Sequence, residues 1–295
     1  MTTVPMLTWL VPSLLALASY GFGQGLAKQW MSDASAPRYC LYYILANSAV
    51  NVWYFHSHPH VSLLEPDARG FVGTGILAYL FDGSAWIFYF LSIARGPVAI
   101  VGTMSAAYPA LTVLFARLFL GEHLGAVQYG AVLLVIGGCI ALSSAHVEEQ
   151  SAARDRSWIP LALAALLCWG ISNTLIKYSY TLPMVLPGSL ALCSSIGGGL
   201  TLGLYGLLGD RSSAHSMRQF AHSVVPMLLM AGGSLGLIIA SDLGPISIVS
   251  PLIGAYPVVT VIYAGLVLKE RISALQYGCI AAIVAGVSML AASGA

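Results

Sequence analysis

The chain has 295 residues, of which 58% are apolar and only 8% are charged, and its mean hydropathy is +0.84. A typical soluble domain carries about 25% charged residues, so this composition excludes an ordinary soluble protein. The formal net charge of +1 provides no basic surface for nucleic acid, and the expected partner is the lipid bilayer.

Long runs without Asp, Glu, Lys or Arg predict a polytopic helical membrane protein, because a membrane-spanning helix needs about 20 mostly apolar residues. The runs lack the period-two alternation of a membrane β-barrel. In chain order, the predicted spans lie near 8–30, 37–56, 69–93, 96–119, 124–145, 157–179, 184–208, 218–241, 244–267 and 272–292.

The chain contains an internal repeat. Residues 96–142 and 244–290 align without a gap, with 19 of 47 positions identical. We therefore expect a first five-helix repeat over 1–146, a polar linker over 147–157 and a second repeat over 158–295. Because five spans per repeat is an odd number, the second copy must enter the membrane the other way up. The predicted fold is all-α, with ten transmembrane helices arranged as two inverted five-helix repeats around a central cavity.

Prolines occupy equivalent places in the two copies. Gly-Pro at 96–97 and 244–245 suits the opening turn of a helix. Pro109 and Pro257 lie within predicted spans and should kink their helices, forming cavity walls or gates, although a simple packing role remains open. The candidate gating positions are Gly96, Pro97, Pro109, Gly244, Pro245 and Pro257.

Asp82 is the most unusual residue, because it lies near the middle of the third predicted span between two charge-free runs. A charge at that depth costs about 2.5–3.5 kcal/mol on insertion scales, so such residues usually face a cavity and bind something. The equivalent residue of the second copy is Met230. The carboxylate is therefore better explained by a substrate or coupling ion than by the shared scaffold.

Aromatic residues accompany Asp82 on one face of the predicted helix: Tyr79, Trp86 and Tyr89. A carboxylate beside aromatic rings suits an ammonium group, because ring faces add a cation–π attraction of about 0.5–2 kcal/mol. The same rings could stack on an aromatic substrate or serve only in packing.

A second group recurs in the first and sixth spans. Its candidate binding residues are Tyr20 and Gln24 in the first copy and Trp169 and Asn173 in the second. Lys28 and Lys177 follow on the same face, where we expect long side chains to reach the lipid headgroups.

The remaining polar residues suggest structural roles. Glu122 should stabilise the N-terminus of the helix that it precedes, as should Glu270. His56, His58 and His60 alternate, but no cysteine or acid completes a metal site. The sequence has no nucleophile elbow, zinc-protease motif or phosphate-binding loop, so neither an enzyme, a metal nor a cofactor is expected.

These features resemble the drug/metabolite transporter superfamily, specifically the EamA-type ten-helix exporters, along essentially the whole chain. Each copy carries an aromatic-Gly pair with a downstream Lys, and then a Pro, Leu-x-Glu, Gln and Gly in the same order. The first copy shows Tyr20-Gly21, Lys28, Pro109, Leu120-Gly121-Glu122, Gln128 and Gly130; the second shows Trp169-Gly170, Lys177, Pro257, Leu268-Lys269-Glu270, Gln276 and Gly278.

Within the superfamily the chain is most similar to bacterial aromatic amino-acid exporters. The resemblance implies a multi-pass protein of the bacterial inner membrane that exports amino acids by alternating access. It also implies cytoplasmic termini, whereas the distribution of Lys and Arg favours exterior termini, so the orientation stays open. Exporters of cationic drugs or other metabolites, and a membrane binding protein that transports nothing, are the alternatives. Proton-coupled and facilitated transport both remain open.

Overall fold

A computed structural model describes residues 8–31, 34–95, 101, 107–144, 156–209, 217–269 and 272–293, and within these ranges it contains helices and no strands. The first half contributes α1 (Leu10–Trp30), α2 (Ala36–Ser57), the 3-10 turn Pro66–Ala68, α3 (Arg69–Ile93), α5 (Tyr108–Phe119) and α6 (Ala126–Ser144). The second half contributes α7 (Trp158–Ser179), α8 (Pro187–Gly198), the π-helical turn Gly199–Gly203, α9 (Leu204–Gly209), α10 (Met217–Leu243), α11 (Ile246–Gly254), α12 (Pro257–Leu266) and α13 (Ala274–Ser293).

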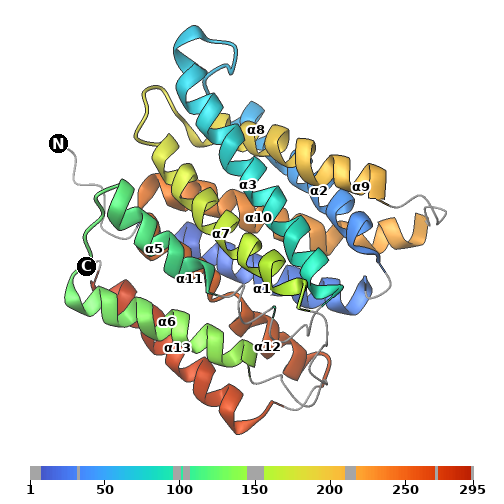
Figure 1. Cartoon of the computed structure of the whole chain (residues 1–295), viewed down its shortest axis with the longest axis vertical. Helices are drawn as coiled ribbons and strands as arrows, with labels where there is room; N and C mark the ends of the chain where they lie inside the picture. Colours follow the sequence, from blue (N-terminus) through green and yellow to red (C-terminus); the bar gives the residue numbers. More distant parts are fainter. Residues whose placement is uncertain are drawn as a thin grey trace.

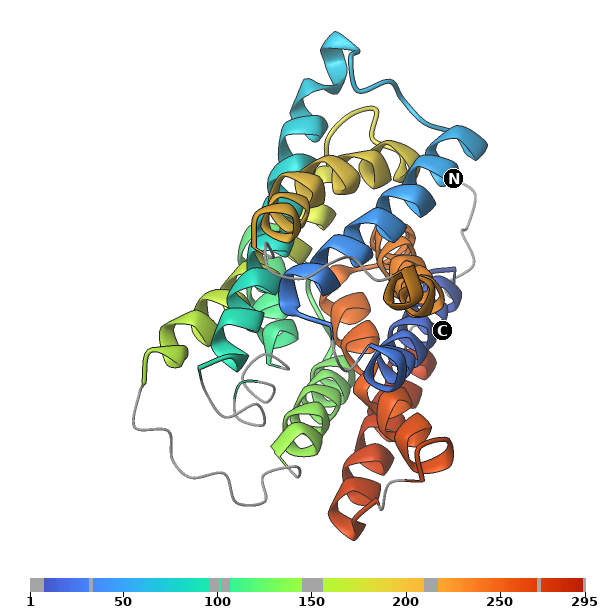
Figure 2. The same cartoon turned by 90° about the vertical axis from the view of Figure 1, so that its right-hand side faces the viewer.

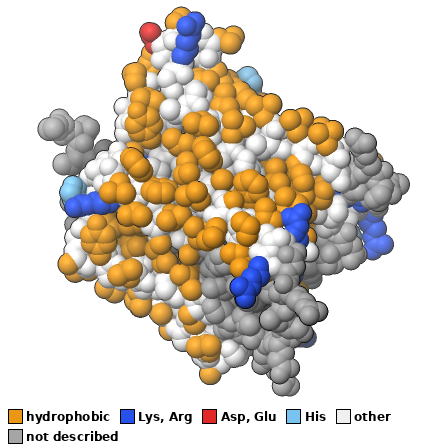
Figure 3. Space-filling model, in the orientation of Figure 1, with side chains coloured by type: hydrophobic (Ala, Val, Ile, Leu, Met, Phe, Trp, Pro, Cys, Tyr) orange, Lys and Arg blue, Asp and Glu red, His pale blue; other side chains and the backbone are white. Residues whose placement is uncertain are grey.

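Seven helical segments of the described residues are long and apolar enough to cross a membrane. They are Leu10–Trp30, Pro66–Ile93, Trp158–Ser179, Pro187–Gly209, Met217–Leu243, Ile246–Leu266 and Ala274–Ser293. α2 has 22 residues but is too polar on average to qualify. Figure 3 shows that hydrophobic side chains dominate the outer face seen there, as expected for a surface in contact with lipid.

Two predicted spans are interrupted. The helix expected over 244–267 is divided into α11 and α12, because the helical conformation is interrupted at Ala255 and Tyr256, just before Pro257. The helix expected over 184–208 contains a π-helical turn in a glycine-rich stretch. Of the predicted span 96–119, the structure describes α5 and Val101, while residues 96–100 and 102–106 lie outside the described residues.

Several contacts between the two halves are made twice, once by a pair of helices and once by the equivalent pair with the halves exchanged. α1 packs against α10 and α12, and the equivalent α7 packs against α3 and α5. Gly21 and Gly170 allow two close approaches, since a Cβ at Gly21 would meet Val259 and a Cβ at Gly170 would lie 2.8 Å from Leu111 Cβ. Val259 is the repeat equivalent of Leu111, so the same contact is made twice with the halves exchanged.

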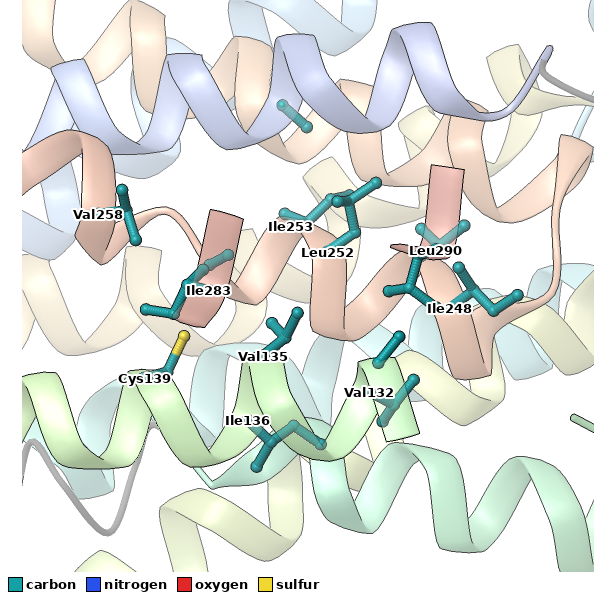
Figure 4. Packing of buried hydrophobic residues seen from close by; sticks show 14 of the residues in the cluster. Val132, Val135, Ile136, Cys139, Ile248, Leu252, Ile253, Val258, Ile283 and Leu290 are labelled. Atoms are coloured by element: carbon teal, nitrogen blue, oxygen red, sulfur yellow. The ribbon is translucent and has the colours of Figure 1, made fainter. Parts of the chain in front are cut away.

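The largest apolar cluster joins α6, α11 and α13. α6 and α13, which are repeat equivalents, lie side by side, and α2, α3 and α8 are grouped at the other end of the molecule (Figures 1 and 2). In Figure 4, Val135 and Cys139 of α6 point toward Ile283 of α13 and the residues of α11. Between these two groups, α1 packs against α10, while α7 packs against α10, α5 and α3, and these helices bring their polar side chains together.

Candidate functional site

Asp82 lies in the middle of α3, and its carboxylate accepts a hydrogen bond from the indole N–H of Trp169 in the middle of α7. An indole can only donate, so the direction of this bond is fixed by chemistry. Both side chains remain partly exposed although their helices pack together. The charge predicted from the sequence is therefore held between the two halves of the chain.

Aromatic rings surround this pair. The Trp169 ring centroid lies 5.4 Å from that of Trp86, 5.6 Å from that of Tyr89 and 5.7 Å from that of Tyr108. Tyr43 of α2 lies 6.1 Å from Trp86. These separations are typical of interacting aromatic side chains. We use the name aromatic cluster for these connected rings together with the neighbouring ring pair of Tyr20 and Tyr256, so its members are Tyr20, Tyr43, Trp86, Tyr89, Tyr108, Trp169 and Tyr256.

Hydroxyl and amide groups complete the cluster. The Tyr43 hydroxyl is hydrogen-bonded to Tyr20 and to Ser234 of α10. A further hydrogen bond joins Gln24 and the Tyr256 hydroxyl. Tyr20 and Tyr43 both interact electrostatically with Asp82, which places their polar ends near the carboxylate. The site thus presents one carboxylate, ring faces and several neutral donors.

Two ring pairs of the cluster are repeat equivalents of each other and have similar geometry. The rings of Tyr20 and Tyr256 are 5.9 Å apart at 47°, and those of Trp169 and Tyr108 are 5.7 Å apart at 49°. Tyr20 is equivalent to Trp169, and Tyr256 to Tyr108, in the duplicated sequence. Asp82 breaks this symmetry, because the equivalent Met230 is a buried apolar residue.

Two residues expected at the site are buried and contact neighbouring helices, although the Tyr79 hydroxyl also interacts electrostatically with Asp82. Tyr79 is only 4% exposed and packs between α3 and α8, where a Cβ at Gly197 would lie 2.7 Å from Tyr79 Cβ. Asn173 is buried and donates from Nδ2 to Ser250 Oγ of α11 at 3.0 Å. Neither side chain makes a ring or hydrogen-bond contact with the aromatic cluster among the contacts that the structure describes. The structure brings Asp82, Trp86, Tyr89, Tyr20, Gln24 and Trp169 together.

The described prolines among the candidate gating positions lie at helix boundaries. Pro257 begins α12, and Pro109 is within the first turn of α5, so neither kinks a continuous helix in the described residues. Pro245 immediately precedes α11. Gly96 and Pro97 lie outside the described residues.

Charged residues of the first and second halves hold the connection between α10 and α11. Both Glu122 carboxylate oxygens accept backbone N–H bonds, from Ile246 at 3.0 Å and Ser247 at 2.9 Å, and one also accepts the Ser247 hydroxyl at 2.5 Å. Lys177 Nζ donates to the carbonyl oxygens of Ser241 and Gly244, both at 2.8 Å. Gly244 itself is pressed against the ring of Trp9.

Both expectations for these residues were wrong in part. Glu122 caps the N-terminus of α11 rather than that of its own following helix, because the fold brings α11 to it. Lys177 satisfies the C-terminal carbonyls of α10 rather than reaching for headgroups. Glu270 lies outside the described residues.

Several site residues were not predicted: Tyr43, Tyr108, Ser234 and Tyr256. Tyr108 and Tyr256 stand in the repeated Ala-Tyr-Pro sequence, of which only the prolines were predicted to have a role. The repetition was the signal that could have found them. Tyr43 and Ser234 carry no comparable signal, since a tyrosine or a serine is common in such helices.

Comparisons with known proteins are consistent with this architecture. The family model described as "EamA-like transporter family" matches residues 6–144 and 156–292. None of the curated proteins compared with the chain is similar enough to count as a match. A solved structure titled only "Crystal structure of protein" superposes with a TM-score of 0.77 at 19% identity and covers 96% of both chains, which shows a common fold. Since the family model spans both halves and nearly the whole length, the chain belongs to the EamA-like transporter family.

Proposed function

We propose that this transporter exports small amine-bearing substrates across the bacterial inner membrane by alternating access. Its preferred substrates are neutral and aromatic amino acids. The two copies are inverted repeats, and Asp82 binds the substrate ammonium where they meet. Trp86, Tyr89 and Trp169 surround the substrate side chain, while Tyr20 and Gln24 supply polar contacts. We keep Tyr79 and Asn173 as supporting residues of this site.

One observation carries the proposal: a carboxylate within a membrane-spanning helix is hydrogen-bonded to an indole of the other copy and faced by aromatic rings of both. The carboxylate supplies Coulomb attraction for a cation, and the ring faces add cation–π attraction of about 0.5–2 kcal/mol. The ring pairs Tyr20–Tyr256 and Trp169–Tyr108 are the same contact made twice with the two copies exchanged, which supports an inverted repeat. Transporters built from inverted repeats bind substrate at the interface between the copies, which is where Asp82 lies.

The direct test is transport by the purified protein in liposomes loaded with labelled amino acids. The proposal predicts protein-dependent efflux of at least one aromatic or neutral amino acid. Absence of protein-dependent flux for every amino acid would contradict it.

A second candidate, an exporter of organic cations, is favoured by the charges around Asp82. The described groups that interact with Asp82 are Trp169 and tyrosines, with no Lys or Arg among them. Residues 96–106, which precede α5, contain no Lys or Arg in the sequence either. The carboxylate of a zwitterion would therefore find only hydroxyl and amide donors. A cation has no carboxylate, and its single positive charge is balanced by the Asp82 carboxylate.

Paired substrates distinguish these candidates. Tryptophan and tryptamine share the ring and the ammonium and differ in the carboxylate. An amino-acid exporter transports tryptophan at least as well as tryptamine, and an organic-cation exporter prefers tryptamine.

A further inference from the structure

Polar residues form a line along one face of α2. Tyr43, Asn47, Asn51 and Tyr54 follow at intervals of four, four and three residues, which places them on one side of a helix, and His58 comes directly after the last residue of α2. At one end, Tyr43 interacts with Asp82. At the other end, the exposed His58 ring stacks on Tyr54 with the centroids 4.1 Å apart. The polar face of α2 therefore leads from the candidate site to the surface.

The middle of this face is buried and has unused hydrogen-bonding capacity. Asn51 is 0% exposed and Asn47 is 3% exposed. Neither amide atom of Asn51 has a partner among the described residues, and Asn47 Oδ1 has none. Buried polar atoms are nearly always paired, with protein or with ordered water, so each exception requires an explanation.

The same buried region includes polar groups of neighbouring helices. Asn47 Nδ2 donates to Ser194 Oγ of α8 at 3.2 Å. The buried Tyr79 hydroxyl of α3 interacts electrostatically with Asp82 and with the side chain of Ser194. α2 and α3 both pack against α8, so these groups gather where the three helices meet (Figure 1).

The unpaired atoms are a mixture of donors and acceptors, which identifies the ligand chemistry. Asn51 Nδ2 can only donate, and the oxygens of Asn47 and Asn51 can only accept. A metal ion or Na⁺ would require acceptors alone, whereas water serves both kinds of group. Polar residues inside membrane proteins are costly and commonly mark ion paths or proton relays.

We propose that water bound along the polar face of α2 carries protons between Asp82 and the His58 end of the helix. Each water or tyrosine hydroxyl accepts one proton and passes on another, while the asparagine amides hold the waters in line. The Asp82 carboxylate gains the proton when substrate leaves and releases it when a substrate cation binds. After each transfer the waters are again neutral, but their hydrogen bonds point the other way, and the waters reorient before the next proton follows.

The surrounding groups leave Asp82 as the proton acceptor of the buried region. The titratable groups that interact with Asp82, or that lie along the path, are Tyr20 on α1, Tyr43 and Tyr54 on α2, Tyr79 on α3, Tyr108 on α5, Tyr180 after α7, Cys193 on α8 and Asp242 on α10. Asp242 faces Tyr54 and Tyr180 and is exposed, so it can exchange protons with solvent directly.

The proposal rests on the transport function above, and its test separates the two. Asn51→Leu replaces the unpaired amide with an apolar side chain of similar size and breaks the line of water. Asn47→Leu is a second interruption one turn away. Ser172→Ala is the matched control, because Ser172 Oγ on α7 is equally buried and unpartnered but lies outside this face.

Two transport modes are measured for each protein in liposomes. In wild type we expect an imposed pH gradient to drive substrate accumulation, and unlabelled substrate to drive exchange at equal pH. Asn51→Leu should lose the pH-driven mode about tenfold or more while keeping exchange, as expected when a proton relay is broken. Ser172→Ala should retain both modes.

Several outcomes would overturn the relay. These are pH-driven accumulation by Asn51→Leu and Asn47→Leu equal to that of wild type, wild-type flux that ignores the pH gradient, or a Na⁺ gradient that drives accumulation instead. If wild type shows no flux in either mode, the proposed transport function itself fails. Monodisperse elution and substrate binding measured by isothermal titration calorimetry establish that a variant with altered transport is folded.

Discussion

Asp82 and Trp169 come from different halves of a duplicated chain, and the indole of Trp169 donates a hydrogen bond to the Asp82 carboxylate. The carboxylate has no equivalent in the second copy, while the aromatic residue has Tyr20 as its equivalent in the first. A symmetric scaffold thus supports an asymmetric charge, and the charge gives the site its chemistry.

The hydrogen bond itself should contribute to stability. Trp169→Phe keeps a ring among Trp86, Tyr89 and Tyr108 but removes the donor. A hydrogen bond to a charged group is worth about 1.5–3 kcal/mol, so we expect thermal unfolding in detergent to shift down accordingly. Trp86→Phe loses the same ring area without losing a donor to Asp82 and should shift less. Equal shifts for both variants would show that ring area, not the bond, matters.

The exchanged packing of the two halves predicts paired effects of alanine substitution. Gly21→Ala and Gly170→Ala each place a methyl group against the backbone or side chains of the other half, and overpacking of this kind costs about 1–3 kcal/mol. Gly130 and Gly278, also repeat equivalents, have no neighbouring atom within 4 Å of an added Cβ. Their alanine variants should be neutral or more stable by about 0.5–1 kcal/mol. Thermal unfolding of the four variants checks the pattern, which fails if the two pairs behave alike.

Glu122 should stabilise the α10–α11 connection, which it contacts directly although more than 100 residues separate them in the sequence. Glu122→Gln removes the negative charge from the α11 N-terminus while keeping the size of the side chain. We expect a loss of about 1–2 kcal/mol from the capping and dipole interactions together. His123→Gln changes the exposed neighbouring residue and serves as the control. A Glu122→Gln variant as stable as this control would rule out the cap.

The sequence predicted the helices well because their signals are local. The limits of α1, α3, α7 and α13 follow from the length of an apolar run, and the structure places them within a few residues of the predicted ends. The break before Pro257 was expected only as a kink, since proline signals a lost hydrogen bond but not whether the helix resumes directly.

Site residues could be predicted where they lie on one face of a single helix or at equivalent positions of the repeat. Asp82, Trp86 and Tyr89 lie on one face of α3, and periodicity shows that. Periodicity does not show what packs against each turn, and Tyr79, which interacts with Asp82, also packs against Gly197 of α8. Tyr43 and Ser234 come from helices distant in sequence and became visible only when α2 and α10 were placed beside Asp82.

Binding of tryptamine and of tryptophan to Asp82→Asn, measured by isothermal titration calorimetry in detergent, tests the central claim most directly. If the carboxylate holds the ammonium, both ligands should bind about 10- to 100-fold more weakly, as expected for the loss of a charge-assisted bond of about 1.5–3 kcal/mol. Asp67→Asn makes the same chemical change at an exposed residue before α3 and should bind as wild type does. Unchanged affinity in a folded Asp82→Asn protein would contradict the account.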